Sequence, residues 1–286
     1  MSIFRPSELK IFLDQLGTKA KKSLSQNFLI DGNIIKKILK AADVKKGDWI
    51  IEIGPGPGAL TEALLNAGAH VIAIEKDHTF AMALARFQTE DKRLEIWEVD
   101  FLQLSLESLL KERQQKKLKV VSNLPYHLTT PIISRLVILN EWIFSLTLMV
   151  QKEVADRFCA EKKTSEYSSF TIFLQFFCSL KYCFTIEPTC FLPSPSVRSA
   201  VVHFSLKQPA PFPRLSEFFQ MTRRAFQQRR KMMRSSLREL YISEKIEQAL
   251  KQIDLNPQAR PEQLSLEEFK KLFLLLSSDI QSSPTL

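Results

Sequence analysis

Glycine, cysteine and long apolar runs are all scarce in this chain of 286 residues. Its four cysteines include no CxxC pair, so we expect buried, reduced thiols and no metal site. Apolar runs such as Ile143–Val150 fall well short of the ~20 residues that a transmembrane helix needs. Charged residues interrupt the N-terminal segment, which therefore has no apolar signal region. We expect a cytoplasmic protein that does not cross a membrane.

The glycines are few and clustered. All seven lie between Gly17 and Gly68, and three of them fall within Gly54–Gly58. Apolar residues make up 45% of the chain and charged residues 25%, which excludes a disordered chain. One tight loop early in the chain is therefore expected, while later turns depend on the 14 prolines and other residues.

Positive charge is concentrated in two segments. The formal net charge is +9, residues 223–238 hold seven Lys or Arg and no acid, and residues 1–50 hold ten against five acids. The remainder of the chain is near neutral. An excess of positive charge favours a polyanionic partner, although a basic run can also be an ordinary solvated helix face.

Strand and helix patterns alternate through most of the chain. Buried-strand patterns occur at Trp49–Ile53, His70–Ile74, Leu94–Val99, Lys119–Ser122 and Phe144–Val150. Helical spacing lies between them, at Ala59–Ala67, Thr79–Thr89, Leu106–Gln115 and Pro131–Leu139, and an earlier helix begins near Ile34 with Asp31 or Asn33 as its cap. This alternation predicts an α/β fold with a parallel sheet that helices cover on both faces. Helices at Lys152–Ala160 and Ser169–Cys178 are followed by strands at Tyr182–Ile186 and Val197–Leu206, which we expect to pair antiparallel at the sheet edge.

A proline-rich linker predicts a domain boundary. QPAPFPR at Gln208–Arg214 holds three prolines. Three helices are predicted beyond it, at Leu215–Leu240, Ser243–Gln252 and Ser265–Leu276. We therefore predict a cofactor-binding catalytic domain at 1–207 and a helical domain at 208–286.

A glycine-rich loop follows the first predicted strand. In IIEIGPGPGALTEALL the strand runs into GxGxG and then into a helix, which lets a ligand approach the helix N-terminus. Glu75 comes 21 residues after Gly54, at the end of the second strand, where its carboxylate can accept hydrogen bonds from ribose hydroxyls. Gly54, Gly56 and Glu75 predict a nucleoside-cofactor site, and they leave NAD and S-adenosylmethionine both open.

Two further motifs favour S-adenosylmethionine. Asp100 ends the third strand and can bind an adenine amino group, although an aspartate there is more often a turn or helix cap. Asn123-Leu124-Pro125-Tyr126 follows the fourth strand. An amide oxygen and a backbone carbonyl can each accept an adenine N6–H, which holds the nitrogen lone pair towards an electrophilic methyl. Proline fixes that backbone, and the tyrosine can stack on an extruded base.

The chain resembles the ribosomal RNA adenine N6,N6-dimethyltransferases, the family of bacterial KsgA and the related Erm enzymes. The matching stretches run in order along nearly the whole chain: Ser25–Asp31 (SQNFLID), Glu52–Thr61 (EIGPGPGALT), Glu75, Val99–Asp100, Asn123–Tyr126 (NLPY), Gln151–Val154 (QKEV) and Phe191–Val202 (FLPSPSVRSAVV). The C-terminal QQRRKMMRSSL resembles the KsgA branch rather than the shorter Erm proteins. The resemblance implies a Rossmann-like, class I S-adenosylmethionine-dependent methyltransferase sheet with a small all-helical C-terminal domain.

The resemblance also implies roles for individual residues. The cofactor would be bound by Asn27, Leu29, Gly54, Gly56, Glu75, Asp100 and Asn123. The target adenine would be held by Asn123, Leu124 and Pro125 and sandwiched between Tyr126 and Phe191. The basic residues that would contact RNA phosphates are Arg223, Arg224, Arg229, Arg230, Lys231, Arg234 and Arg238. On one continuous helix, four of these would share a face at near-i+4 steps, namely Arg223, Arg230, Arg234 and Arg238.

The implied activity is dimethylation of N6 of two adjacent adenosines in the 3′-terminal hairpin loop of 16S rRNA, within the small (30S) ribosomal subunit. Direct in-line transfer leaves S-adenosylhomocysteine and needs no metal, no covalent enzyme intermediate and no assigned general base. We expect a monomer with a role in ribosome biogenesis. An NAD(P)-dependent oxidoreductase would explain the glycine loop and Glu75 but not NLPY or the basic run. A ribosome-assembly factor with secondary methyltransferase activity, and an Erm-type large-subunit target, stay open.

Overall fold

The structure is a computed structural model that describes residues 4–20, 26–113 and 117–278. It divides into two compact units. Unit 1 comprises Met1–Ala155 and Cys178–Gln208, and unit 2 comprises Asp156–Phe177 and Pro209–Leu286. Ser25 of the SQNFLID motif, the last two residues of the expected Leu106–Gln115 helix and the C-terminal tail lie outside the described residues.

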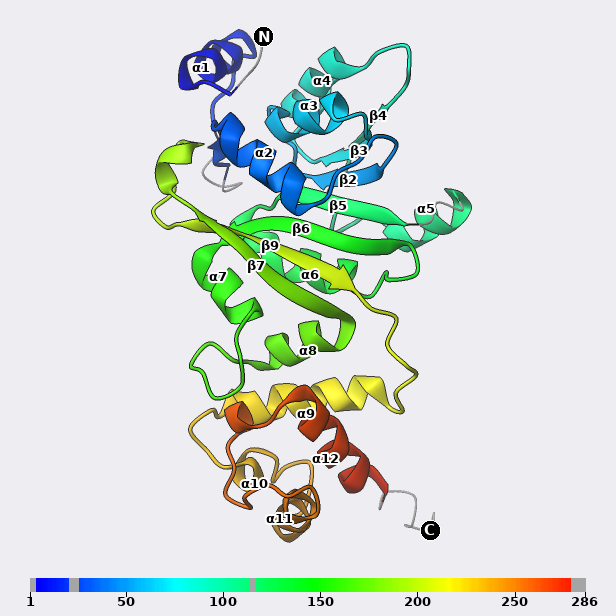
Figure 1. Cartoon of the computed structure of the whole chain (residues 1–286), viewed down its shortest axis with the longest axis vertical. Coiled ribbons are helices and arrows are strands. Elements are labelled where there is room, and N and C mark those ends of the chain that lie inside the picture. The colour runs from blue at the N-terminus through cyan, green and yellow to red at the C-terminus, as the bar shows by residue number, and fades with distance from the viewer. Residues whose placement is uncertain (1–3, 21–25, 114–116, 279–286) are drawn as a thin grey trace. The chain divides into compact units, whose positions relative to one another are not determined.

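Unit 1 contains a seven-stranded sheet in the order β4-β3-β2-β5-β6-β9-β7 (Figure 1). The strands are β2 (Trp49–Ile53), β3 (His70–Glu75), β4 (Leu94–Glu98), β5 (Leu118–Asn123), β6 (Ile143–Gln151), β7 (Cys178–Ile186) and β9 (Ser199–Leu206). Neighbouring strands from β4 to β6 pair in parallel, whereas β9 pairs antiparallel with both β6 and β7. The predicted parallel sheet with an antiparallel pair at its edge is therefore confirmed.

Helices cover the sheet, which is why its central strands are mostly apolar. Ile50 and Ile51 of β2 are fully buried, as are Val120 and Val121 of β5. The helices of this part of the chain are α1 (Pro6–Gln15), α2 (Gly32–Ala41), α3 (Ala59–Asn66), α4 (His78–Leu84), α5 (Leu106–Arg113), α6 (Thr129–Leu136) and α7 (Lys152–Phe158). Asp31 is the residue that caps α2, since its Oδ1 accepts hydrogen bonds from the backbone N–H groups at 33 and 34.

A second, two-stranded sheet joins distant motifs. The strands β1 (Phe28–Leu29) and β8 (Phe191–Leu192) pair antiparallel, with Phe28 opposite Leu192 and Leu29 opposite Phe191. Neither strand was predicted, because two residues are too few to show a period-2 pattern. The pairing places the SQNFLID segment beside the FLPSPSV segment.

Unit 2 is helical and has a phenylalanine core. Its helices are α8 (Ser169–Phe177), α9 (Leu215–Gln227), α10 (Met233–Ser236), α11 (Ser243–Gln252) and α12 (Leu266–Ser278). Phe173 and Phe176 of α8 lie with their ring centroids 5.1 Å and 5.4 Å from the ring of Phe219 on α9, and Phe218 lies 5.6 Å from Phe273 on α12. These contacts group residues 156–177 with the C-terminal helices, whereas the sequence placed that segment in the first domain.

The long basic helix expected at Leu215–Leu240 is interrupted. Helix α9 ends at Gln227, Gln228 leaves the helical region with φ −123° and ψ 61°, and α10 begins only at Met233. Met233 is fully buried, and its N–H donates to the carbonyl of Ala259 at 2.8 Å. The N–H of Met233 therefore bonds to a residue far along the chain instead of continuing the hydrogen-bond ladder of α9, so tertiary contacts override helical propensity here. The expectation that four arginines share one helical face is therefore wrong.

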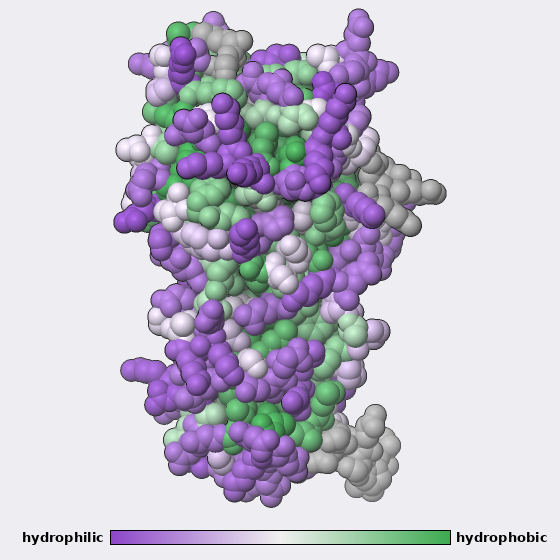
Figure 2. All heavy atoms as spheres, in the orientation of Figure 1, coloured by the Kyte–Doolittle hydropathy of each residue, from purple (hydrophilic) through white to green (hydrophobic). Residues whose placement is uncertain are grey.

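Hydrophilic residues cover most of the face shown in Figure 2, with smaller hydrophobic areas between them. Among the described residues, no helix is both long and apolar enough to cross a membrane.

Candidate active site

The predicted cofactor residues meet at the carboxyl ends of the parallel strands. Gly54 follows β2, Glu75 ends β3, Asp100 follows β4 and Asn123 ends β5. Parallel strands end at the same edge of a sheet, which is where ligands bind in open α/β folds. One cavity is lined by all seven predicted cofactor residues and by three further residues of the NLPY motif, Leu124, Pro125 and Tyr126. The predicted cofactor residues and the NLPY motif, which lie far apart in the sequence, thus line the same cavity.

The glycine loop has a backbone that only glycine adopts readily. Gly56 and Gly58 have φ values of 55° and 89°, and Gly58 is the N-cap of α3. A Cβ atom on Gly58 would lie 2.7 Å from side-chain atoms of both Leu84 and Phe87, so no larger residue fits without a shift. The loop therefore lies close against α4 and its following turn, and its open side faces the cavity.

Glu75 holds this loop in place. Its Oε2 accepts a hydrogen bond from the N–H of Gly56 at 2.9 Å, and its Oε1 accepts one from the N–H of Asp77 at 2.8 Å. Burial raises the pKa of Glu75, and the two backbone donors oppose that shift. Each carboxylate oxygen has two lone pairs, so the side chain can still accept hydrogen bonds from a ligand in the cavity.

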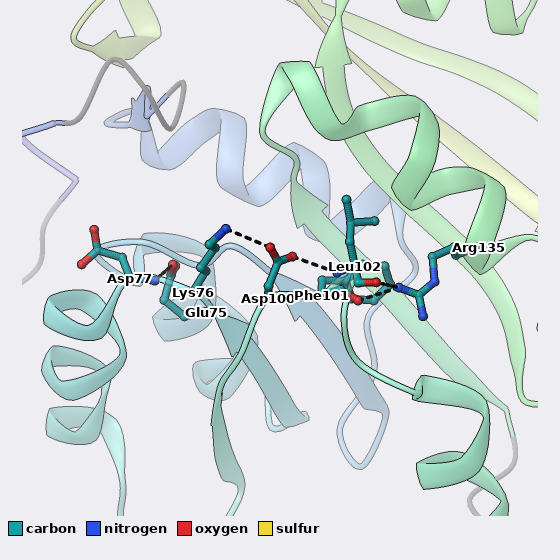
Figure 3. A network of polar contacts seen from close by, with 7 residues as sticks. All are labelled: Glu75, Lys76, Asp77, Asp100, Phe101, Leu102 and Arg135. Carbon is teal, nitrogen blue, oxygen red and sulfur yellow. Dashed lines mark hydrogen bonds and ion pairs between the residues drawn. The ribbon is translucent and has the colours of Figure 1, made fainter.

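Asp100 also lines the cavity and is held by two donors (Figure 3). Its Oδ2 accepts from Lys76 Nζ at 2.9 Å, and its Oδ1 accepts from the N–H of Leu102 at 2.9 Å. The hydrogen bond from Lys76 lowers the pKa of Asp100, so the carboxylate stays charged at neutral pH. Sequence analysis missed Lys76, because a single exposed lysine carries no signal.

The NLPY motif presents polar groups to the same cavity. Asn123 Nδ2 donates to the backbone carbonyl of Asn27 at 3.2 Å, which orients its amide oxygen as an acceptor. The hydroxyl of Tyr126 lies 2.7 Å from the buried hydroxyl of Ser199 on β9. The structure thus connects NLPY with the SQNFLID segment and with the serine of the FLPSPSVRSAVV segment.

The structure does not bring Phe191 to the cavity. Its side chain is only 2% exposed and belongs to the core cluster that also contains Leu29 and Val201. In the β1–β8 pairing Phe191 lies opposite Leu29, and both side chains pack into this cluster, whereas Phe28 and Leu29 also line the cavity. A base sandwiched between Tyr126 and Phe191 would require Phe191 to leave the core.

Glu52 is a cavity residue that sequence analysis missed. It lies within the apolar strand WIIEI, is 2% exposed, and accepts a hydrogen bond from Thr61 Oγ1 at 2.7 Å. Burial raises the pKa of Glu52 to about 8, a shift that the Thr61 hydrogen bond opposes. The signal that could have revealed it is an acid at a position where a buried strand requires an apolar residue.

Replacing Glu52 by glutamine is expected to stabilise the ligand-free protein more at pH 9 than at pH 5.5. The pKa of Glu52 is higher in the folded protein than its ordinary value of 4.5. The contribution of this carboxyl group to stability is therefore complete below about pH 4.5 and is lost as the pH rises through about 8. Glu52→Gln keeps the shape and removes the charge, so we expect a gain on the order of 2–4 kcal/mol at pH 9 and little change at pH 5.5. Urea unfolding of the wild-type protein and the variant at both pH values measures this change in the free energy of unfolding. An equal change at pH 9 and pH 5.5 would contradict the interpretation that Glu52 is a buried acid.

The predicted RNA-binding residues of unit 2 fall into two groups. Arg224 pairs with Glu239, Arg234 pairs with Glu247, and Arg229 donates to the backbone carbonyl of Tyr167 at 2.9 Å. The other basic side chains form no ion pair or hydrogen bond with another described residue and are exposed: Arg223, Arg230, Lys231 and Arg238. Within the described ranges, no three or more His, Cys, Asp or Glu side chains are grouped so that they could hold a metal ion.

Comparisons with known proteins identify the family of the chain. The model of the ribosomal RNA adenine dimethylase family matches residues 17–278. The chain is 54% identical over 275 residues to ribosomal RNA small subunit methyltransferase A of Protochlamydia amoebophila, covering 96% of this chain and 97% of that protein. It is 47% identical over 281 residues to the protein of the same name from Chlamydia abortus, covering 97% and 99%.

Solved structures share the fold. A dimethyladenosine transferase from Plasmodium falciparum is 24% identical, with a TM-score of 0.74 over 86% of this chain and 96% of that chain. The 23S rRNA methyltransferase ErmE is 23% identical, with a TM-score of 0.67 over 87% and 99%. The sheet with its helices is thus the class I methyltransferase fold that the motifs implied. The chain belongs to the ribosomal RNA adenine dimethylase family.

Proposed function

We propose that this protein transfers methyl groups from S-adenosylmethionine to N6 of two adjacent adenosines in the 3′-terminal hairpin loop of 16S rRNA. The observation that carries the proposal is the meeting of Asn123 and Tyr126 of NLPY with Glu75 and Asp100 in one cavity. Relatives at 54% and 47% identity bear the name ribosomal RNA small subunit methyltransferase A, which supports 16S rRNA over a large-subunit target.

The cavity fits S-adenosylmethionine. An added Cβ atom on Gly56 would lie 3.2 Å from the ring of Phe28, so the glycine lets this ring pack directly against the loop at the cavity wall. Glu75 retains lone pairs for ribose hydroxyls, and Asp100 can accept from the adenine amino group. Asn27 and Leu29 would line the methionine side. When bound, the cofactor supplies a methyl group on a positively charged sulfur, which is already activated for transfer.

The NLPY residues would hold the target adenine. The amide oxygen of Asn123 and the carbonyl of Leu124 would each accept an N6–H, which directs the nitrogen lone pair into the cavity. Pro125, with φ −58°, fixes the backbone directly after Leu124 and so orients the Leu124 carbonyl. Tyr126 would stack on the extruded base, and Ser199 keeps its ring in place. Catalysis then rests on positioning and electrostatics rather than on a general base, because the methylated ammonium is acidic enough to lose its proton to water.

Tyr126 and Phe191 are expected to respond differently to substitution. Tyr126→Ala should lower kcat/KM for rRNA about 5- to 150-fold, the value of one lost base stack, with a small effect on unfolding. Phe191→Ala should instead cost about 3–5 kcal/mol of stability, because the ring is buried. Urea unfolding and activity per folded molecule separate the two. A stable Phe191→Ala protein without activity, beside a fully active Tyr126→Ala protein, would assign the stack to Phe191.

Unit 2 would bind the ribosomal particle. Four of its basic residues are exposed and form no ion pair with another described residue, so they can contact RNA phosphates. They account for much of the positive charge of residues 223–238. The substrate would be the rRNA within a pre-assembled small subunit in the cytoplasm, and the enzyme would act as a monomer because its partner is itself a large particle.

The direct test maps methyladenosines by mass spectrometry after incubation of unmethylated small subunits with the protein and S-adenosylmethionine. Two adjacent N6,N6-dimethyladenosines near the 3′ end are expected. Modification of 23S rRNA alone, or no modification at all, would overturn the proposal.

Calorimetric titration with NAD and with S-adenosylmethionine tests the alternative function. Binding of S-adenosylmethionine and not of NAD would exclude an NAD(P)-dependent oxidoreductase. Rescue of a ribosome-assembly defect by an inactive variant would indicate an additional assembly role.

A further inference from the structure

The loop that follows β4 forms one wall of the cavity. Its residues Val99, Asp100, Phe101 and Leu102 all line the cavity, and the loop ends where α5 begins at Leu106. The N–H of Leu102 donates to Asp100 Oδ1, so the position of the carboxylate depends on the path of this backbone. Lys76 also holds the carboxylate, but its side chain is 61% exposed and is therefore a weak anchor.

Arg135 of α6 holds this loop from the other side (Figure 3). Its Nη1 donates to the carbonyl of Phe101 at 3.0 Å and to the carbonyl of Leu102, and its Nη2 donates to the carbonyl of Leu104 at 2.5 Å. The guanidinium carbon also lies 5.6 Å from the ring centroid of Phe101. Only a planar fork with several donors can reach three carbonyls of one loop in this way.

The helix that carries Arg135 is itself part of the site. Helix α6 starts at Thr129, directly after the 3-10 turn Tyr126–Leu128 that continues NLPY. Ile132, one turn before Arg135 on α6, also lines the cavity. One side chain therefore links the segment that would hold the target base with the loop that would hold the cofactor adenine.

We propose that Arg135 is a positioning residue for cofactor recognition: it fixes the loop at Asp100–Leu104 so that the Asp100 carboxylate faces the adenine amino group. It touches neither substrate nor cofactor and acts through Asp100. The inference rests on the proposed function, since it requires that Asp100 bind the adenine of S-adenosylmethionine.

The test measures dissociation constants by calorimetry for S-adenosylhomocysteine and for its inosine analogue, which lacks the amino group that Asp100 would accept. Arg135→Met should bind S-adenosylhomocysteine about tenfold more weakly, because the variant lacks three hydrogen bonds that order the loop. The preference for S-adenosylhomocysteine over the inosine analogue should shrink by a similar factor. Amide exchange in residues 100–105 should become faster. In turnover, KM for S-adenosylmethionine should rise while kcat stays nearly constant.

Two further variants control the test. Arg135→Lys keeps the charge but not the fork, so it should restore only part of the affinity; full restoration would show that charge alone matters and would overturn the proposal. Arg93 is a matched control, because its guanidinium also donates to a backbone carbonyl, that of Leu65, but Leu65 is not a cavity residue. Arg93→Met should leave the ligand preference unchanged.

The outcomes separate the inference from the function on which it rests. If the wild-type protein does not distinguish the two ligands, or if Asp100→Asn does not reduce the preference, the assignment of Asp100 to the adenine fails. If both hold and Arg135→Met keeps the wild-type preference, Arg135 has no positioning role and the inference fails alone. A loss of preference equal in Arg93→Met and Arg135→Met would reflect general destabilisation and would also overturn it.

Discussion

Replacing Asn123 by alanine is expected to lower the rate of methyl transfer about 10²- to 10³-fold, the usual effect of removing one group that acts on the reacting atoms. The substitution removes the acceptor for one adenine N6–H, so the nitrogen lone pair is no longer directed into the cavity. Stability should fall by only about 1 kcal/mol, because the one hydrogen bond that disappears, to the carbonyl of Asn27, is a long one of 3.2 Å. Tritiated-methyl incorporation into unmethylated small subunits measures the rate.

Asn140 provides the matched control for this variant. Its side-chain amide also donates to a backbone carbonyl, that of Lys207 at 2.7 Å, but it is not among the cavity residues. Asn140→Ala should therefore lose a similar amount of stability and keep its activity. Near-normal methylation by Asn123→Ala would refute the role of Asn123, and inactivity of both variants would mean that the loss arises from folding.

Reversing two charges, Arg223→Glu with Arg230→Glu, is expected to weaken binding to the small subunit about 100-fold at low salt. Each arginine that no longer neutralises a phosphate should reduce the slope of log K against log [salt] by about 1, so the double variant should have a slope smaller by about 2. Both side chains are exposed and unpaired with other described residues, so the fold should tolerate the change. Filter binding across a salt series measures both quantities.

The control for the charge reversal changes two lysines elsewhere in unit 2. Lys251→Glu with Lys271→Glu alters the net charge equally, from exposed positions on α11 and α12. An equal loss of binding in this variant would indicate a general effect of net charge. Unchanged binding by the Arg223→Glu, Arg230→Glu variant would show that these two arginines do not contact RNA phosphates.

Much of the sheet could be predicted from the sequence because its signals are local. The strands at Trp49–Ile53 and His70–Glu75 are runs of apolar residues bounded by turns, so their existence follows from composition and length. Helix α11 at Ser243–Gln252 was predicted to the residue, since its apolar positions repeat at helical spacing. Residues placed directly after parallel strands must meet at one edge, and the cavity that contains Glu75 and Asp100 follows from that rule.

Other features depend on contacts between distant parts of the chain. Leu29 and Phe191 pair across two strands of two residues each, which carry no periodic signal. The break after Gln227 accompanies a hydrogen bond from the N–H of Met233 to the distant Ala259 carbonyl, although the local sequence favours a continuous helix. Burial also gives Glu52 a pKa of about 8, and no neighbouring residue in the sequence indicates that shift.

Three properties follow from the sequence alone: three of the seven glycines form one tight loop, polar residues follow successive strands, and positive charge is concentrated in residues 1–50 and 223–238. These properties depend on residue type and spacing, which are local. Three other properties depend on the tertiary structure. Phe191 is buried while Tyr126 lines the cavity, some of the arginines form ion pairs and others do not, and Arg135 holds the loop that follows Asp100. Those outcomes depend on which side chains exclude water from one another and which carbonyls come within reach of a donor, and the folded chain alone sets these distances.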